Sequence, residues 1–359
     1  MILPVTFAKS LAPFLLAALL PAAAGLAGLG PVPALAEGLP GAPAPFDKGG
    51  VRIAVVSFIG GGDWLQAFEA GAKRQGAALK ADLRISEARN DPSAERDLVQ
   101  QAINQHVDAL VINNGKPEAL KDLAQQALDA GIKVVAYDVD LDNPKIPQVE
   151  QSDARMAQLT IGEALRQQGP HFTAGVIHVA GFAPLDRRYA EWQKEQAHYG
   201  FKQVATWGVV NDNVASSVDD QTKAVLRAHP DITVIFAPWD EFARGAKLAI
   251  DELGVADKVK IYGIDISTAD IQAIREPGSP WVATAATNAG VVGEVAIRTA
   301  ALLVAGQNPG HSVEIQPALI TRDELIRNDI KTIEDLTAKV PSFRASEAAQ
   351  ASWIPAAKR

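Results

Sequence analysis

Residues 108–137, DALVINNGKPEALKDLAQQALDAGIKVVAY, carry the pattern on which the predicted fold depends. Two mainly apolar runs, 108–112 and 132–137, in which only Asp108 and Lys133 are charged, flank a helix-period segment over 117–130 that ends at Gly131. Runs without polar alternation are typical of parallel strands covered on both faces, and a glycine just beyond a helix is a common stop signal. The stretch therefore predicts a strand, a helix and a second, parallel strand.

The same alternation continues in both directions along the chain. Upstream, it predicts strands over 52–57 and 83–86 and helices over 64–80 and 92–105, the second opened by Asp91 as N-cap and by proline. A second set follows, with helices over 153–168, 185–199, 214–228, 240–252, 267–276 and 289–305 and strands over 173–179, 202–209, 232–236, 258–264 and 281–286. Repeated strand–helix–strand units indicate an α/β fold of doubly wound, Rossmann-like sheets. The pattern alone does not say on which set residues 281–330 pack.

Composition and charge exclude several classes of protein. The 359 residues hold 34 Lys+Arg and 42 Asp+Glu, a formal net charge of −8, and they contain no cysteine. A net negative chain is not expected to bind nucleic acid, because neutralising phosphates needs a basic surface. Without cysteine there is no disulfide scaffold, thiolate metal site or cysteine nucleophile.

The first 36 residues are expected to be a cleaved signal peptide. Lys9 is the only charged residue before Glu37, residues 11–29 are almost wholly apolar, and Ala34-Leu35-Ala36 gives the small-x-small cleavage pattern. A membrane anchor is the alternative, and the prolines in the segment favour cleavage. Residues 37–50, EGLPGAPAPFDKGG, are rich in proline and glycine and are expected to form a flexible leader.

Polar residues follow the predicted strands where each strand ends. In doubly wound sheets, ligands bind beyond the carboxyl ends of the strands. The positions just past these ends are rich in Asp, Asn, Arg and Trp: 57–64, 113–114, 138–142, 181–188, 211–213, 239–240, 265 and 287–288. Carboxylates and amides bind hydroxyl groups, Arg donates to sugar oxygens, and indole rings pack on C–H faces. The set favours a neutral, polyhydroxylated ligand.

Several stretches carry a resemblance to a known family. They are VRIAVVSF (51–58) leading to Gly62-Asp63-Trp64, strand ends at Asn113 and Asp138, AHPDITVIFAPWDEFARGA (228–246), Gly263-Ile264-Asp265 and the pair Arg187-Arg188. In this order, over about residues 51–322, they resemble the periplasmic sugar-binding proteins of the ribose-binding type, which supply ABC importers. Individually the motifs are weak, and the ordered set is specific.

The resemblance implies a set of ligand contacts. Asp138, Arg188 and Asp265 would anchor hydroxyl groups, and Trp64 and Trp239 would be the stacking walls. The remaining expected contacts are Asp63, Asn113 and Asn288. No catalytic residue, cofactor or metal ion is expected.

The resemblance also implies two lobes joined by a three-segment hinge, with crossings near 152–153, 287–288 and 316–317. The N-terminal lobe would comprise 51–152 and 288–316, and the C-terminal lobe 153–287 and 317–335. Hinge closure would bury the ligand, and the closed, monomeric protein would deliver it in the periplasm to a membrane permease and in some cases to a chemoreceptor. Residues 336–359 extend past the usual family end and form either a strap or a loose tail.

Departures from the family leave the ligand open. Val139 stands where an Arg usually follows the Asp, and Trp239 replaces an Asn, so the ligand is not expected to be ribose bound in the usual way. A pentose, hexose, deoxysugar or polyol fits, and Asp138-Val139-Asp140 is also similar to the binding proteins for autoinducer-2. An enzyme is disfavoured because the Gly60–Gly62 turn lacks nucleotide-loop spacing and no nucleophile elbow or His-Glu-x-x-His motif occurs. A sugar-responsive repressor would need a basic helix-turn-helix where this chain has its apolar start.

Overall fold

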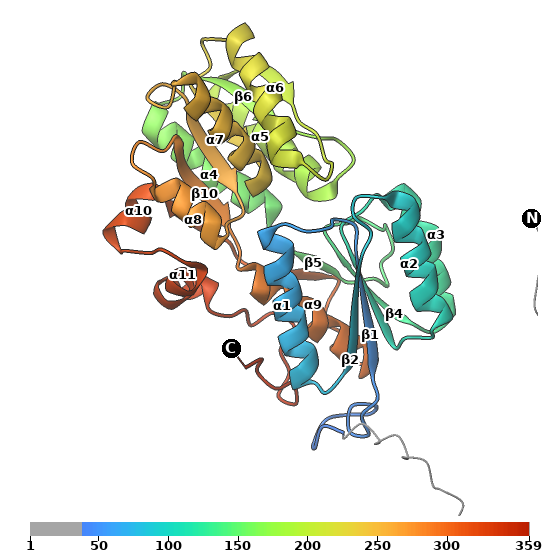
Figure 1. The fold of residues 1–359 in the computed structure, drawn as a ribbon. Helices are drawn as coiled ribbons and strands as arrows, with labels where there is room; N and C mark the ends of the chain where they lie inside the picture. Colours follow the sequence, from blue (N-terminus) through green and yellow to red (C-terminus); the bar gives the residue numbers. More distant parts are fainter. Residues whose placement is uncertain (1–37, 359) are drawn as a thin grey trace, which may run out of the picture. The chain divides into compact units, whose positions relative to one another are not determined.

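The computed structural model describes residues 38–358 and arranges them around two six-stranded sheets (Figure 1). The strand order is β11-β5-β4-β3-β1-β2 in the first sheet and β12-β10-β9-β8-β6-β7 in the second. All neighbouring strands are parallel except β10 and β12. The strands are β1 Arg52–Ser57, β2 Asp82–Glu87, β3 Ala109–Asn113, β4 Lys133–Tyr137, β5 Gln148–Glu150, β6 Thr173–Ile177, β7 Lys202–Trp207, β8 Val234–Ala237, β9 Lys260–Ile264, β10 Trp281–Ala286, β11 Ser312–Glu314 and β12 Ala318–Thr321.

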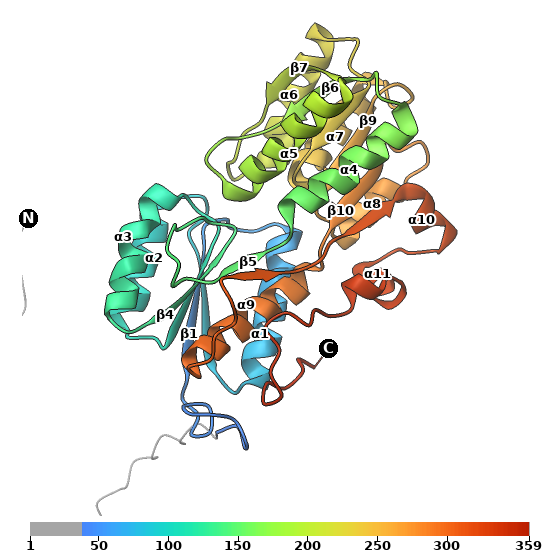
Figure 2. The same ribbon diagram turned by 180° about the vertical axis from the view of Figure 1, so that it is seen from behind.

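Helices cover both faces of each sheet. The first sheet with α1, α2, α3 and α9 is the N-terminal lobe, and the second with α4 to α8, α10 and α11 is the C-terminal lobe. In the C-terminal lobe, α6, α7 and α8 cover one face (Figure 1) and α4 and α5 the other (Figure 2). The helices are α1 Asp63–Ala78, α2 Pro92–Asn104, α3 Pro117–Asp129, α4 Asp153–Gln168, α5 Ala183–Tyr199, α6 Val214–Ala228, α7 Asp240–Leu253, α8 Thr268–Arg275, α9 Ala289–Val304, α10 Arg322–Arg327 and α11 Ile333–Lys339. The prediction of two doubly wound α/β lobes is confirmed.

The apolar runs of the sequence become strands buried on both faces. In β1, Ile53 and Val55 pack on the side of α1 and α9, while Ala54 and Val56 pack on the side of α2 and α3. Successive side chains of a strand point to opposite faces, so a run without polar residues needs a cover on both. This double cover holds the carboxyl ends of the strands at one edge of each sheet.

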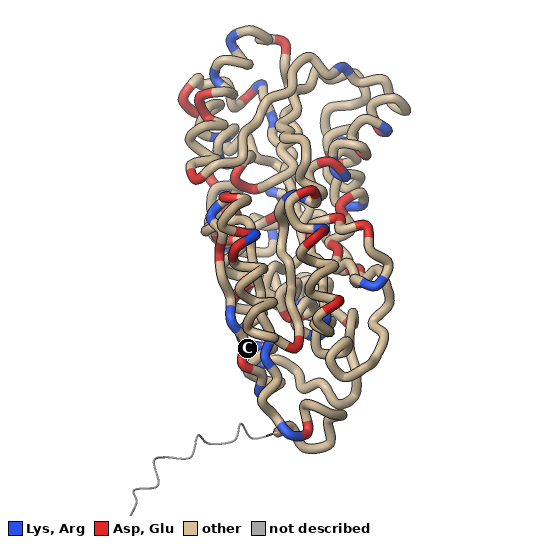
Figure 3. Tube along the Cα trace, turned by 90° about the vertical axis from the view of Figure 1, so that its right-hand side faces the viewer, with Lys and Arg blue, Asp and Glu red and all other residues tan. Residues whose placement is uncertain are grey.

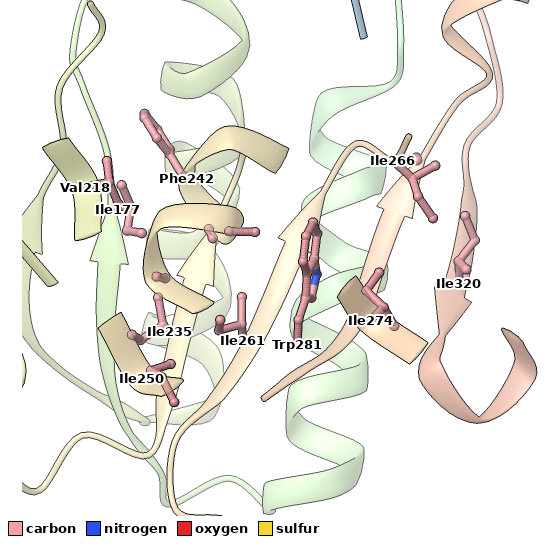
Figure 4. Close-up of a cluster of buried hydrophobic side chains, with 14 of the residues drawn as sticks. Ile177, Val218, Ile235, Phe242, Ile250, Ile261, Ile266, Ile274, Trp281 and Ile320 are labelled. Carbon is pink, nitrogen blue, oxygen red and sulfur yellow. The ribbon is translucent and has the colours of Figure 1, made fainter. Parts of the chain in front are cut away.

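The core of the C-terminal lobe shows the same construction (Figure 4). Figure 4 shows Ile177, Ile235, Ile261 and Trp281 among side chains from the helices, with Val218, Phe242, Ile250 and Ile274 labelled. Trp281 is fully buried, and a Cβ on Gly263 would lie 2.7 Å from the indole nitrogen. Only glycine fits at position 263, because the Trp281 indole occupies the space that a side chain there would need.

The chain passes between the lobes three times in the order the sheets require. It leaves the first sheet after β5 for α4, returns after β10 to α9, and leaves again after β11 for β12. Residues 281–330 are therefore divided between the lobes. Strands β10 and β12 belong to the second sheet, whereas α9 and β11 belong to the N-terminal lobe.

A fourth passage is made by the C-terminal segment. Phe343 is buried in the C-terminal lobe, whereas Ile354 is buried in the N-terminal lobe. Between them, the Arg298 guanidinium donates to the carbonyls of Ser346 (3.0 Å) and Ala348 (3.1 Å). Of the two alternatives for residues 336–359, the described part forms a strap.

The expectation of a flexible leader is wrong for residues 38–50. Phe46 is 1% exposed and packs on Trp353 of the strap with ring centroids 5.1 Å apart. The Leu39 N–H donates to the Phe46 carbonyl at 2.7 Å, which closes the segment into turns. Phe46 is the feature of the sequence that distinguishes this segment from a flexible linker, because a large aromatic side chain favours burial. The expected signal peptide lies outside the described residues.

Within residues 38–358, no helix combines the length and apolar character that crossing a membrane requires. Lys and Arg are interspersed with Asp and Glu along both lobes (Figure 3).

Candidate functional site

Two adjoining hollows lie between the lobes, at the carboxyl ends of strands from both sheets. The inner pocket encloses about 60 Å³ and is lined by Ile59, Trp64, Asn114, Asp138, Gln151, Phe182, Pro184, Leu185, Arg188, Val210, Trp239 and Asp265. The outer chamber encloses about 130 Å³ and is lined by Ile59 to Leu65, Asn90, Asn114, Asn211, Asp212, Val214 and Trp239 to Glu241. Four residues line both hollows: Ile59, Trp64, Asn114 and Trp239. The location is the one that doubly wound sheets favour for ligands.

Arg188 is the central cation of the inner pocket. Its side chain is buried on α5, where Nε donates to Asp153 Oδ1 at 2.7 Å. One terminal nitrogen donates to the Pro238 carbonyl at 2.6 Å and to Asp265 Oδ2 at 3.3 Å. Burial acts to lower the pKa of Arg188, but the carboxylates of Asp153 and Asp265 outweigh it and raise the pKa. The guanidinium therefore stays charged and holds Asp265 in place.

Arg187 links the two lobes beside the inner pocket. Its Nε donates to Asp153 Oδ2 at 2.8 Å, and its terminal nitrogens contact Asp140 at 2.8 Å and Asp138 at 3.3 Å. Asp138 and Asp140 follow β4 in the N-terminal lobe, whereas Arg187 lies on α5 in the C-terminal lobe. Charge therefore holds the lobes together on the hinge side of the pocket.

Asp138 and Asp265 occupy matching positions in the two lobes, each directly after the fourth strand from the sheet's β2 or β7 edge. Both have a left-handed backbone, with φ of 53° and 73°, which Asp tolerates better than most residues. Burial and the charge of Asp153 raise the pKa of Asp138 to about 7. Burial also raises the pKa of Asp265 to about 6, against the opposing effect of Arg188. Asp265 Oδ1 is buried without a partner, so one acceptor faces the pocket unused.

Aromatic rings form opposite walls of the pocket. Trp64 stacks on Tyr137 with centroids 5.6 Å apart and an interplanar angle of 6°, and Phe68 extends the stack. Trp239 comes from the C-terminal lobe and meets Phe242 edge-on at 5.2 Å. The Trp64 indole N–H is buried without a partner and is therefore a free donor beside the pocket.

The rest of the inner pocket is apolar. Ile59, Phe182, Pro184, Leu185 and Val210 line it alongside the charged groups. Phe182 contacts Phe58 across the lobes at 5.8 Å. The pocket thus offers hydrogen-bond partners to one part of a ligand and an apolar wall to another.

Of the eight expected contacts, five meet at the inner pocket: Trp64, Asp138, Arg188, Trp239 and Asp265. Asp63 lines only the outer chamber, where its carboxylate accepts a 2.8 Å bond from Arg244 of α7. In the structure Asp63 forms an ion pair between the lobes, and its expected contact with the ligand stays a prediction. The spacing from β1 is the same for both roles, so the sequence does not separate them.

Asn113 and Asn288 lie away from both hollows. Asn113 is the last residue of β3, fully buried, and its amide donates to Ser57 Oγ at 3.0 Å within the sheet. Asn288 caps α9 by accepting from Gly290 N–H at 3.0 Å, and it donates to Thr337 and to the Phe343 carbonyl. The Asn288 side chain is fully engaged in these bonds, whereas Asn113 Oδ1 is buried without a partner. Neither residue lines a hollow, and their expected contact with the ligand stays a prediction.

Three residues that shape the pocket are absent from the eight expected contacts, although position 114 is among the strand-end positions that the sequence singles out. Asn114, not Asn113, lines it, because a φ of 63° turns the chain at the strand end. Gln151 donates to Asp138 at 3.3 Å and accepts from Thr287 at 2.6 Å, which joins two of the passages between lobes. Asp153 holds both arginines. Of these three, Asn114 had a signal in the sequence, because an Asn followed by glycine tolerates a left-handed turn.

The family described as "Periplasmic binding protein domain" matches residues 53–308. The D-ribose/D-allose-binding protein of Pseudomonas aeruginosa is 32% identical over 255 residues, 64% of this chain and 75% of that protein. The ribose import binding protein of Bacillus subtilis is 27% identical over 226 residues, 60% of this chain and 69% of that protein.

Among solved structures, a 5-methylthioribose transporter solute-binding protein from Thermotoga lettingae, in complex with 5-methylthioribose, superposes with a TM-score of 0.83. It is 34% identical, and the match covers 85% of this chain and 97% of that one. A sugar ABC transporter protein from Yersinia enterocolitica gives a TM-score of 0.81 at 27% identity, covering 85% and 93%.

Proposed function

Because the chain belongs to the periplasmic binding protein family, we propose that it captures a sugar or sugar alcohol between its lobes and delivers it to an ABC import permease. The site of action would be the periplasm, which the apolar start of the sequence with its small-x-small pattern supports. Sugar binding is the family role that the relatives share.

One observation carries the proposal: the buried Arg188–Asp265 pair leaves Asp265 Oδ1 without a partner at the inner pocket. A sugar hydroxyl can donate to that oxygen while its own oxygen accepts from a neighbouring donor. Hydrogen bonds to a charged group in a desolvated site are each worth about 1.5–3 kcal/mol. The described lining offers hydrogen bonding and ring contact, and it contains no Ser, Cys, His or Lys that would act as a nucleophile or base.

The apolar wall supports a narrower ligand class. A fully hydroxylated sugar would leave Phe182, Leu185 and Val210 facing hydroxyl groups, whereas an apolar substituent would pack on them. The similar Thermotoga lettingae protein is in complex with 5-methylthioribose, a pentose with such a substituent. A deoxypentose with a small apolar group is therefore the first candidate, ahead of ribose itself.

Contacts between the lobes support ligand capture by closure. Besides Arg187, Asn90 of the N-terminal lobe donates to Asp212 of the C-terminal lobe at 2.9 Å. The three passages of chain beside the pocket would act as the hinge, and ligand would shift the population toward the closed state. The closed form would be the one that the permease recognises.

The test is isothermal titration calorimetry of the ligand-free protein with ribose, allose, xylose, 5-methylthioribose and ribitol. We expect one of these to bind with micromolar or tighter affinity, and Asp265→Asn to weaken it at least tenfold. Asp231→Asn is the matched control, because this exposed residue precedes β8 at the opposite end of the sheet. Absence of binding to every sugar and polyol tested, with no sugar copurifying by mass spectrometry, would overturn the proposal.

A further inference from the structure

The outer chamber carries an excess of negative charge. Four carboxylates line it, Asp63, Asp212, Asp240 and Glu241, and no lining residue among those described is Lys or Arg. The nearby Arg244 bonds to Asp63 at 2.8 Å, to Glu241 at 3.2 Å and to Asp270 at 2.6 Å. This single cation is thus shared among three carboxylates and leaves the chamber uncompensated.

Asp240 is the group with least compensation. It begins α7, is 1% exposed, and its Oδ1 accepts the Glu241 N–H at 2.9 Å. Its Oδ2 is buried without any partner, although the residue lines the chamber. Burial, together with Asp270 and Asp265, raises its pKa well above the usual value, and Arg244 does not offset this.

Other partners in the chamber are also unused. Asn90 Oδ1 is buried without a partner, and so is the indole N–H of Trp64. A buried polar group without a partner costs stability until something binds it. Two free acceptors beside surplus negative charge match a group that donates several hydrogen bonds and carries positive charge.

The two hollows lie on either side of shared wall residues. They share Ile59, Trp64, Asn114 and Trp239, and the outer one has about twice the volume of the inner, 130 against 60 Å³. A ligand anchored at Arg188 and Asp265 would leave the larger hollow open unless a second group extended into it.

We propose that the ligand is a sugar or polyol bearing a protonated amino group, and that this ammonium occupies the outer chamber beside Asp240 and Glu241. The inference rests on the proposed sugar-binding function of the inner pocket and adds a second, charged group to a ligand whose apolar part lies in the inner pocket. A primary ammonium has three N–H donors, which match the unpartnered acceptors Asp240 Oδ2 and Asn90 Oδ1 and one further acceptor.

The experiment compares amino sugars with their neutral parents. Glucosamine with glucose, galactosamine with galactose, and 5-amino-5-deoxyribose with ribose are titrated by calorimetry at pH 6.5. We expect at least one amino compound to bind roughly tenfold tighter than its parent, the gain expected of a charge-assisted contact. Added salt should weaken the amino compound more than its parent, because screening acts on the ion pair.

Variants separate the chamber from the rest of the site. Asp240→Asn and, independently, Glu241→Gln should reduce the preference for the amino compound while leaving affinity for the neutral parent within about twofold; Asp231→Asn should change neither. If neutral parents bind as tightly as amino compounds, or the preference survives both variants, the inference fails while sugar binding stands. If neither class binds, the proposed function itself fails.

Discussion

The inner pocket and the outer chamber adjoin, yet their charges are balanced differently. Around the inner pocket, Asp138, Asp153 and Asp265 share two guanidinium groups that bond to them directly. Around the outer chamber, a single Arg244 serves three carboxylates and leaves Asp240 unpaired.

This difference separates two uses of buried charge. Where each carboxylate has a bonded cation, charge fixes the geometry of the walls, and the ligand needs to supply only neutral hydroxyl groups. Where carboxylates outnumber cations, the missing charge has to come from a proton or from the ligand. The comparison therefore predicts that removing a cation harms the inner pocket most.

Arg188→Met should have the largest effect. It leaves Asp265 buried without its bonded cation and takes from Asp153 one of its two guanidinium partners, and breaking a buried pair typically costs about 3–5 kcal/mol. Urea unfolding measures this loss in the free energy of unfolding. Adding Asp265→Asn to Arg188→Met should restore part of the loss, because one uncompensated carboxylate is then gone. A loss below about 1 kcal/mol in the single variant would mean that the inner charges are not balanced by Arg188.

The pH dependence of stability should be the next largest effect. The pKa of Asp265 is raised to about 6 and that of Asp138 to about 7, above ordinary values near 3.9. A raised carboxyl pKa means that the folded state holds protons that the unfolded state has released, so stability is greatest below about pH 4 for these groups. It should fall between pH 5 and pH 7 by on the order of 2–4 kcal/mol.

Urea unfolding at intervals from pH 5 to pH 8 tests this fall. Glu95, whose pKa is raised to about 8 by burial, adds a further fall over the same window. The pKa values of Asp122, Glu163 and Asp329 are lowered, so their contributions change mainly below that window. Asp138→Asn should flatten the slope. A stability that rises from pH 5 to pH 7 would contradict the raised values.

How far the sequence predicts this molecule depends on whether a residue acts locally. Strands such as β3 and β4 are predictable because an unbroken apolar run has few alternatives to a doubly covered strand. Asp138 and Asp265 are predictable as pocket residues because each follows a strand at the edge where ligands bind. Their position in the pattern is enough, since the strand ends bring them to the pocket even though each also bonds to a distant arginine.

The expected ligand contacts that lie outside the inner pocket have partners far away in the sequence. Asp63 meets Arg244, and Asn288 meets Phe343, across sequence separations of 181 and 55 residues. No local pattern records such contacts, and the side chains are of the same types that bind sugars. The order of the segment around Phe46 is unpredictable for the same reason, because Phe46 is covered by Trp353 of the strap, far away in the sequence.

Asn288→Ala provides a reference outside both hollows. It removes the cap of α9 and two bonds to the C-terminal segment, so the free energy of unfolding should fall by about 1–2 kcal/mol. Affinity for the ligand, measured by calorimetry at a temperature where the variant is folded, should stay within twofold. A tenfold loss of affinity without loss of stability would return Asn288 to the list of ligand contacts.

Asp63→Asn should have the smallest effect and sharpens the comparison most. The Asp63 side chain is 42% exposed, and exposed ion pairs contribute about 0.2–1 kcal/mol, so ligand affinity should weaken only about two- to fivefold. Because the pair joins the lobes, the loss should appear in the dissociation rate, measured by stopped-flow tryptophan fluorescence, and be equal for every sugar that binds. High salt should shrink the difference between variant and wild type, since screening weakens the same pair in the wild type. A loss above tenfold that varies with the sugar would instead make Asp63 a direct ligand contact, as its position after β1 first suggested.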